Sequence, residues 1–230
     1  MSEIATTGET VARQLPEGVR VLAEKAVGET LVRYRSGVGL LDRRLFELSD
    51  PHADARFDGV DGLGSWSVRV LLGHLADAEL VYAHRIRRAV AEDRPVLANW
   101  DEAPFIDAGL YEAGTGQAGL RSAPPVGGFV AMLYTTRQWL GEWMMALDDS
   151  VWSRTLLHPW YGATTTQELL AIVTWHFEHH VGFLRRKMDR LVGPVAPGGC
   201  CSSGGGCACE AEGKAKPDEG GCCGGGSSEH

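Results

Sequence analysis

Residues 165–191, TTQELLAIVTWHFEHHVGFLRRKMDRL, decide the fold class of this 230-residue chain. Thr165 and Glu168 have the spacing of a capping box, in which the two side chains satisfy the first free backbone amides of a helix. Apolar residues then recur every three or four positions, as on one buried helix face: Leu170, Val173, Phe177, Leu184, Met188 and Leu191. We therefore predict a long amphipathic helix here.

The same spacing recurs in three earlier stretches. They run from Leu31 to Leu48, from Val68 to Ala89 and from Phe129 to Leu147, and Ser65 or Ser67 is available to cap the second. Long connections with prolines and glycines separate them, the longest at residues 93–125. Strand signals are nearly absent from the sequence. The pattern predicts an all-α protein, a four-helix bundle with long crossover connections.

The two ends of the chain differ from this core in composition. All six cysteines lie in Pro194–His230, a stretch that has no Leu, Ile, Met, Phe, Tyr or Trp and therefore cannot build an apolar core. We predict a bundle over residues 1–193 and a disordered, low-complexity Cys/Gly-rich tail over residues 194–230. Residues 1–25 are expected to be a weakly ordered extension, because Pro16 and Gly18 interrupt a helix, although Val19, Val21 and Leu22 could dock on the body.

Charge and hydropathy exclude several classes of protein. With 22 Lys and Arg against 30 Asp and Glu, the net charge of -8 argues against a protein that binds nucleic acid by neutralising phosphates. No apolar run approaches the roughly 20 residues of a membrane-spanning helix. The start of the chain has no basic cluster followed by an apolar stretch, so we expect a cytoplasmic protein without a membrane partner.

The placement of the histidines suggests where chemistry could occur. At about 100° per residue, His176 and His180 lie one turn apart on the flank of the buried face, while His179 looks outward. His74 lies on the inward side of the second helix. Three imidazoles can hold a divalent cation and leave a position open for water or substrate. The alternative is that these are hydrogen-bonded core histidines or surface residues.

Three nearby residues have two interpretations each. Asp77 could orient an imidazole or form an inter-helix salt bridge, and Arg85 could meet an anionic substrate or pair with an acid. His158 could line the mouth of the site or shape its loop. Glu79 lies about 140° from His74 around the helix, and we do not expect it to be a ligand.

Two motifs resemble the DinB-like superfamily, which includes the bacillithiol transferases. The first is Trp66–Glu79, with His74 inside it, and the second comprises His158–Gly162, Thr166 and Trp175–His180. The resemblance covers residues 28–192. It implies a four-helix bundle with a divalent metal, often zinc or nickel, held by three histidines, which are carried over to His74, His176 and His180. It also implies that homodimers are frequent.

The resemblance leaves the reaction open. The superfamily includes S-transferases that use bacillithiol or mycothiol, a mycothiol-dependent maleylpyruvate isomerase and many members named as metal-dependent hydrolases. We expect an enzyme in which the metal site activates a water or a low-molecular-weight thiol to attack a small-molecule substrate. Residues 1–193 contain no cysteine, so the core offers no cysteine nucleophile.

The alternative function is a non-catalytic metal-binding or buffering protein. In that case the cysteines of the tail would capture metal, since thiolates suit zinc and copper(I). Their spacing does not match the paired Cys-x-x-Cys ligands of structural zinc sites, and they could equally be incidental to a low-complexity extension.

Overall fold

The computed structural model describes residues 12–60 and 62–195. These residues form mainly α-helices, together with short 3-10 helices and one small β-hairpin. The α-helices are α1 (Glu17–Ala23), α2 (Val27–Ser36), α3 (Asp50–Ala53), α4 (Val68–Ala91), α5 (Ala103–Asp107), α6 (Val126–Met145) and α7 (Thr166–Val192). The remaining elements are the 3-10 helices η1 (Gly37–Leu40), η2 (Arg43–Glu47) and η3 (Asp149–Ser153) and the strands β1 (Thr155–His158) and β2 (Gly162–Thr165).

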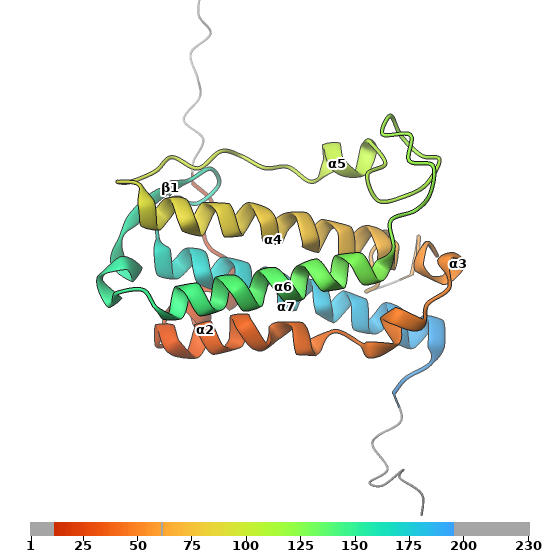
Figure 1. The fold of residues 1–230 in the computed structure, drawn as a ribbon, viewed down its shortest axis with the longest axis horizontal. Coiled ribbons are helices and arrows are strands. Elements are labelled where there is room, and N and C mark those ends of the chain that lie inside the picture. Colours follow the sequence, from red (N-terminus) through yellow and green to blue (C-terminus); the bar gives the residue numbers. More distant parts are fainter. Residues whose placement is uncertain (1–11, 61, 196–230) are drawn as a thin grey trace, which may run out of the picture. The chain divides into compact units, whose positions relative to one another are not determined.

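The predicted four-helix bundle is confirmed. Helices α2 and α4 lie at opposite corners of the bundle, and each packs against both α6 and α7. The connection from α4 to α6 runs back along the bundle and carries α5 on its way, so α4 and α6 point in the same direction (Figure 1). None of the helices in the described part of the chain combines the length and the apolar character needed to cross a membrane.

The two longest helices begin as their sequences predict. Ser67 caps α4, where its side-chain oxygen accepts a hydrogen bond from the backbone N–H of Val70 at 3.1 Å. The capping box of α7 is complete: the Thr165 hydroxyl accepts from the Glu168 N–H at 3.1 Å, and the Glu168 carboxylate accepts from the Thr165 N–H at 2.7 Å. These caps satisfy backbone amides that lack a partner within the helix, and they fix where both helices begin.

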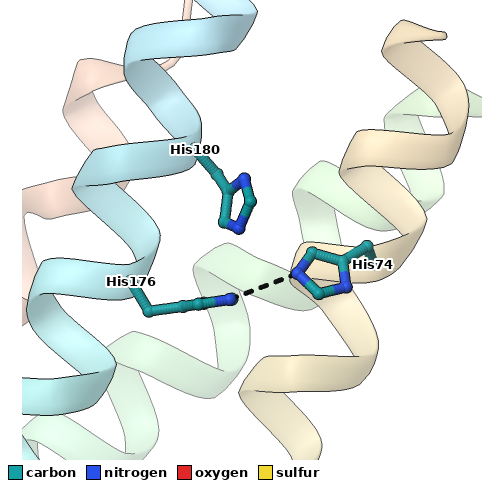
Figure 2. Close-up of side chains that lie close together, drawn as sticks. All are labelled: His74, His176 and His180. Atoms are coloured by element: carbon teal, nitrogen blue, oxygen red, sulfur yellow. Dashed lines mark hydrogen bonds between the residues drawn. The ribbon is translucent and has the colours of Figure 1, made fainter. Parts of the chain in front are cut away.

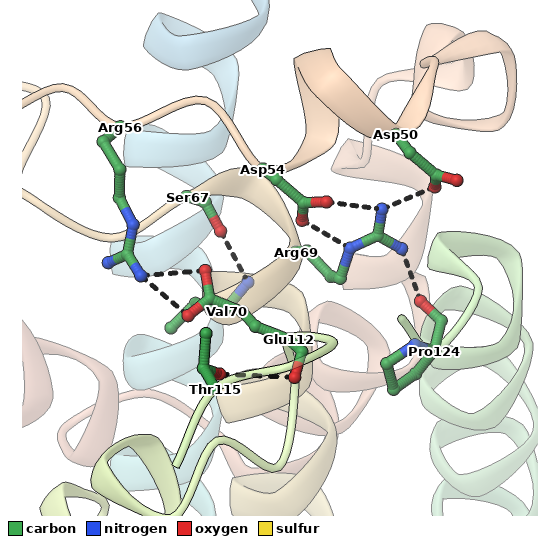
Figure 3. Close-up of polar contacts among 9 residues, drawn as sticks. All are labelled: Asp50, Asp54, Arg56, Ser67, Arg69, Val70, Glu112, Thr115 and Pro124. Atoms are coloured by element: carbon green, nitrogen blue, oxygen red, sulfur yellow. Dashed lines mark hydrogen bonds and ion pairs between the residues drawn. The ribbon is translucent and has the colours of Figure 1, made fainter. Parts of the chain in front are cut away.

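A buried arginine holds the start of α4 against its neighbours. The guanidinium of Arg69 donates to Asp54 and Asp50, each at 2.6 Å, and to the Pro124 carbonyl at 2.5 Å (Figure 3). Asp50 and Asp54 belong to α3 and its C-terminal cap, and Pro124 precedes α6. One side chain therefore ties three segments together at the end of the bundle where α4 begins.

The first predicted helix is broken in the structure. The stripe from Leu31 to Leu48 is divided among α2, η1 and η2. Gly37 and Gly39 weaken a continuous helix, because glycine loses more backbone conformational entropy than other residues when it becomes helical. The Asp42 carboxylate then accepts the Arg44 backbone N–H at 2.9 Å and starts the separate turn of η2.

The prediction that Pro16 and Gly18 interrupt a helix is wrong. Helix α1 begins directly after Pro16, a position where a missing N–H removes no helical hydrogen bond. Val19 and Leu22 are buried against the body. Gly18 permits this docking, because a Cβ there would lie only 2.3 Å from Trp175 Nε1. Residues 1–11 of the predicted N-terminal extension lie outside the described residues.

The sequence also missed the hairpin formed by β1 and β2. Its antiparallel register pairs Thr155 with Thr165 and His158 with Gly162, and Gly162 adopts a φ of 71°. Four residues per strand are too few to show a clear alternation of apolar and polar positions. The hairpin leads directly into the capping box and so sets where α7 starts.

The chain divides into two units after Pro194, and the predicted cysteine-rich tail lies outside the described residues apart from its first two. The core of the first unit has two apolar clusters. One includes Tyr82 and Val173, and the other includes Leu71, Leu75 and Phe177. In sequence, His176 stands between Val173 of the first cluster and Phe177 of the second.

Candidate metal centre

Three histidines from two helices converge inside the bundle. His74 comes from α4, and His176 and His180 come from α7 (Figure 2). One ring nitrogen from each residue lies within 4.8 Å of those of the other two, and the Nε2 atoms of His74 and His176 are 3.2 Å apart. The structure thus brings together the three histidines that the sequence selected.

Helical geometry explains why these histidines meet and their neighbour does not. The rings of His176 and His180 are one turn apart on α7 and meet edge to face, with centroids 4.6 Å apart. His179 is exposed and stacks on Trp175, with ring centroids 4.8 Å apart. The pair that faces the interior is therefore 176/180 and not 176/179.

Burial keeps all three imidazoles neutral. Desolvation lowers the pKa of His74 to about 4. Desolvation, helped by the neighbouring His74 and His179, lowers the pKa of His180 to about 3. The pKa of His176 falls well below its usual value, mainly through burial and then through the charges of the adjacent histidines. Neutral imidazole is the form that binds a metal, so no proton has to be removed at neutral pH.

The donor set fits a divalent cation. Two nitrogens bound 2.0–2.1 Å from a tetrahedral zinc lie about 3.4 Å apart, close to the 3.2 Å between His74 and His176. The widest spacing in the trio, up to 4.8 Å, exceeds this value, so the rings must close slightly to share one ion. Three neutral nitrogens suit zinc or nickel better than magnesium or calcium, which prefer oxygen ligands.

His74 is oriented by aromatic packing rather than by a carboxylate. Its ring packs against Trp66, with centroids 5.0 Å apart, and against Trp100, with centroids 5.6 Å apart and planes at 21°. Its buried Nδ1 has no hydrogen-bond partner among the described residues. Asp77 instead accepts a hydrogen bond from the Tyr111 hydroxyl at 2.5 Å, so the structure does not show the interaction with an imidazole that the sequence suggested for it.

Glu79 belongs to a buried ion pair and not to the histidine cluster. Its carboxylate accepts from Arg137 Nε at 2.8 Å and from the Tyr34 hydroxyl. The Arg137 guanidinium lies between two rings, 4.4 Å from the centroid of Tyr34 and 3.8 Å from that of Phe177. Because Phe177 adjoins His176 in sequence, this pair supports the helix wall behind the site.

Arg85 and His158 lie at the hairpin end of α4. Arg85 is buried and donates to the Ala98 carbonyl at 2.9 Å, and among the described residues no carboxylate oxygen lies within 4.0 Å of it. An ion pair between Arg85 and an acidic side chain, one of its two interpretations, is therefore not seen among the described residues. His158 accepts the Trp160 backbone N–H at Nδ1 at 3.2 Å and stacks on Tyr161, which supports its loop-shaping interpretation.

His158 gives the fold a measurable dependence on pH. Burial, with a smaller contribution from the charge of Arg85, lowers its pKa to about 4. Between pH 6.5 and about 4 the unfolded chain binds a proton that the folded chain does not, so stability falls as pH falls. His158→Asn keeps an acceptor for Trp160 but does not titrate. We expect the wild type to lose up to about 2 kcal/mol more stability than the variant between pH 7 and pH 5.

Urea unfolding of both proteins at the two pH values measures this difference. An equal loss of stability in the two proteins would show that His158 does not contribute.

A cavity of about 190 Å³ opens beside His180. Its lining is mostly apolar and includes one amine: Leu63, Gly64, Ser65, Trp66, Leu71, His180, Phe183 and Lys187. The sequence indicates Trp100, in a long connection, as a packing residue, but does not predict that it packs on the ring of His74. Lys187 was not predicted, although its position two turns after His180 on α7 places both on one helix face.

Comparison with known proteins gives a consistent family match. A model of the DinB superfamily matches residues 39–184. The chain is similar to "Putative metal-dependent hydrolase YfiT" of Bacillus subtilis, with 23% identity over 139 residues, 60% of this chain and 72% of that protein. A protein of Bacillus pumilus named "Putative metal-dependent hydrolase" is 22% identical over 178 residues, 77% of this chain and 95% of that protein.

The solved structure of YfiT is also similar in fold. The TM-score is 0.60 at 18% identity, over 78% of this chain and 93% of YfiT. Its description names "an unusual four-helix bundle topology" and calls YfiT "a probable metal-dependent hydrolase". At this identity the likeness supports the fold of the chain described above.

Proposed function

Because the chain belongs to the DinB superfamily, we propose that it is a metal-dependent hydrolase whose cation is held by His74, His176 and His180. The reaction would add water across an ester or amide bond, placing the hydroxyl on the acyl carbon and the proton on the leaving group. The names of the relatives support the class of reaction, and the three converging imidazoles are the single observation that carries the proposal.

The chain supplies a preorganised set of neutral ligands. Desolvation lowers the pKa of all three imidazoles, and packing against Trp66 and Trp100 holds the ring of His74 in place. In such a site, a divalent cation supplies Lewis-acid chemistry, polarising the bond under attack and lowering the pKa of water.

The cavity next to His180 favours catalysis over metal storage. A storage or structural site is enclosed by four protein ligands, whereas a catalytic site keeps a position open to small molecules. Only three histidines meet among the described residues, and the cavity reaches one of them. Its apolar walls suit a small-molecule substrate with an apolar portion.

Metal removal tests this function directly. The full chain is alkylated at its six cysteines, all of which lie in the tail, so that thiolates do not compete for metal. It is then stripped with a chelator and reloaded with one equivalent of zinc or nickel. We expect hydrolysis of small p-nitrophenyl esters and anilides to disappear on stripping and to return on reloading.

A variant with all three histidines replaced by alanine provides the background rate. If chelation leaves the rate unchanged, or the triple variant is as active as the wild type, the proposal is wrong. Turnover that requires an added low-molecular-weight thiol and gives a thiol adduct would instead identify S-transfer.

A further inference from the structure

The cavity beside His180 also has a cationic group in its lining. Lys187 lines the same cavity and lies two turns after His180 on α7, about 10 Å further along the helix axis. A separation of seven residues returns the side chain to nearly the same helix face. One small cavity therefore has a candidate metal ligand and an amine in its walls.

The ammonium group of Lys187 has N–H donors that no described residue accepts. The side chain is buried, and Nζ donates to the Gly64 carbonyl at 3.0 Å and lies 4.5 Å from the centroid of the Phe57 ring. An ammonium group has three N–H donors, so this single hydrogen bond leaves two without a partner among the described residues. No carboxylate oxygen of those residues lies within 4.0 Å of Nζ.

The charge of Lys187 survives burial at neutral pH. Desolvation, with a contribution from nearby Arg186, lowers the pKa of Lys187 to about 8, so most molecules remain protonated at pH 7. A buried cation without a counter-charge is unfavourable, and an anionic ligand would relieve that cost.

Anchoring of the loop before α4 does not explain a charge at this position. Arg186 is exposed and already holds the same loop by donating to the Gly62 carbonyl at 2.8 Å. The side chains that line the cavity together with His180 and Lys187 are chiefly apolar, including Leu63, Leu71 and Phe183. Such a lining fits a short hydrocarbon chain.

We propose that this cavity selects substrates in which a carboxylate is joined by a short apolar chain to the bond that is hydrolysed. The Lys187 ammonium binds the carboxylate, and the apolar walls hold the chain so that the bond lies at His74, His176 and His180. This inference rests on the proposed function, because it places the reacting bond at the histidine cluster. Lys187 thereby determines specificity and takes no part in the chemical step.

Two hydroxamates that differ at one end test the inference by binding rather than by turnover. Adipic acid monohydroxamate carries a metal-chelating hydroxamate and a terminal carboxylate, and hexanohydroxamic acid ends in a methyl group instead. Titration calorimetry on the zinc-loaded, cysteine-alkylated full chain is expected to show tighter binding of the carboxylate-ended probe. A charge-assisted hydrogen bond predicts a preference of about 10-fold to 100-fold.

Variants of Lys187 locate this preference. Lys187→Met keeps the length and apolar stem of the side chain, and it should abolish the preference while leaving the affinity for hexanohydroxamic acid largely unchanged. Lys187→Arg should retain the preference. Arg186→Met is the matched control, because it removes a neighbouring positive charge that holds the same loop but does not line the cavity.

Probes with the same two ends and two to six methylenes between them measure the distance between the histidine cluster and the group that binds the carboxylate. The optimum is expected near four, because His180 and Lys187 are about 10 Å apart along the axis of α7.

The outcomes separate this inference from the proposed function. If both probes bind only when zinc is present but with equal affinity in the wild type, the inference is wrong and the metal centre stands. If the preference persists in Lys187→Met, another group binds the carboxylate and the inference is also wrong. If neither probe distinguishes the wild type from the triple histidine variant, the metal centre itself is refuted, and this inference with it.

Discussion

The His176→Ala variant is expected to lose metal binding and with it hydrolytic activity. The Nε2 of His176 lies 3.2 Å from that of His74, and its ring meets that of His180 with centroids 4.6 Å apart, so His176 contacts both other members of the trio. Loss of even an outer-shell partner lowers metal affinity by 10-fold to 100-fold, so loss of a ligand should lower it by more than about 100-fold. Elemental analysis and titration against a chromophoric chelator measure the change, and the rate on small esters should fall to background.

His179→Ala is the matched control for this prediction. It removes an imidazole from the same helix, three residues away, but one that is exposed and stacked on Trp175. Metal content and hydrolysis should both be close to wild type. The assignment of ligands fails if His179→Ala loses as much metal as His176→Ala, or if His176→Ala retains normal affinity once the cysteines of the tail are alkylated.

The second large effect is expected from Glu79→Ala, which should reduce the free energy of unfolding by about 3–5 kcal/mol. The substitution removes the counter-charge of Arg137, a side chain with 0% exposure that is held between the rings of Tyr34 and Phe177. The Tyr34 hydroxyl loses its acceptor in the same change. Urea unfolding of the metal-free protein, followed by circular dichroism, measures the loss without a contribution from metal binding.

Two further proteins make the reason for that loss testable. The double variant Glu79→Leu/Arg137→Met leaves no unpaired charge and should regain most of the lost stability. Glu178→Ala breaks a more exposed pair with Arg33 that has contacts of 2.5 and 2.6 Å, and it should cost less than about 1 kcal/mol. A small effect of Glu79→Ala, or no recovery in the double variant, would contradict the account of the buried pair.

The local parts of the fold could be predicted because their signals are local. Ser67, Thr165 and Glu168 mark helix starts with side chains that bond to backbone groups within three residues. The apolar spacing of α4, α6 and α7 repeats at the period of the helix itself. The prediction failed where a tertiary contact outweighed local helix propensity. Gly18 has the low helix propensity of any glycine, but its lack of a Cβ lets α1 pack against Trp175.

The candidate site could likewise be predicted only in part from the sequence. Helical phase alone distinguished His176 and His180 from His179, because the three share one helix. Their meeting with His74, 102 residues earlier in the chain, required the crossover connections and the packing of α4 against α7. The spacing of the histidines predicts which face of a helix each one lies on, but not how deeply its side chain is buried in the bundle.

The sequence by itself determined where the long helices lie, which face of each is buried and which histidines point inward, because a period of 3.6 residues is a property of the local chain. Only the tertiary structure decided that Glu79 pairs with Arg137, that Trp66 and Trp100 hold the ring of His74, and that Lys187 shares a cavity with His180. Those contacts depend on how far each helix slides and rotates against its neighbours. That choice is made by the packing of the whole core and is not encoded in any single stretch.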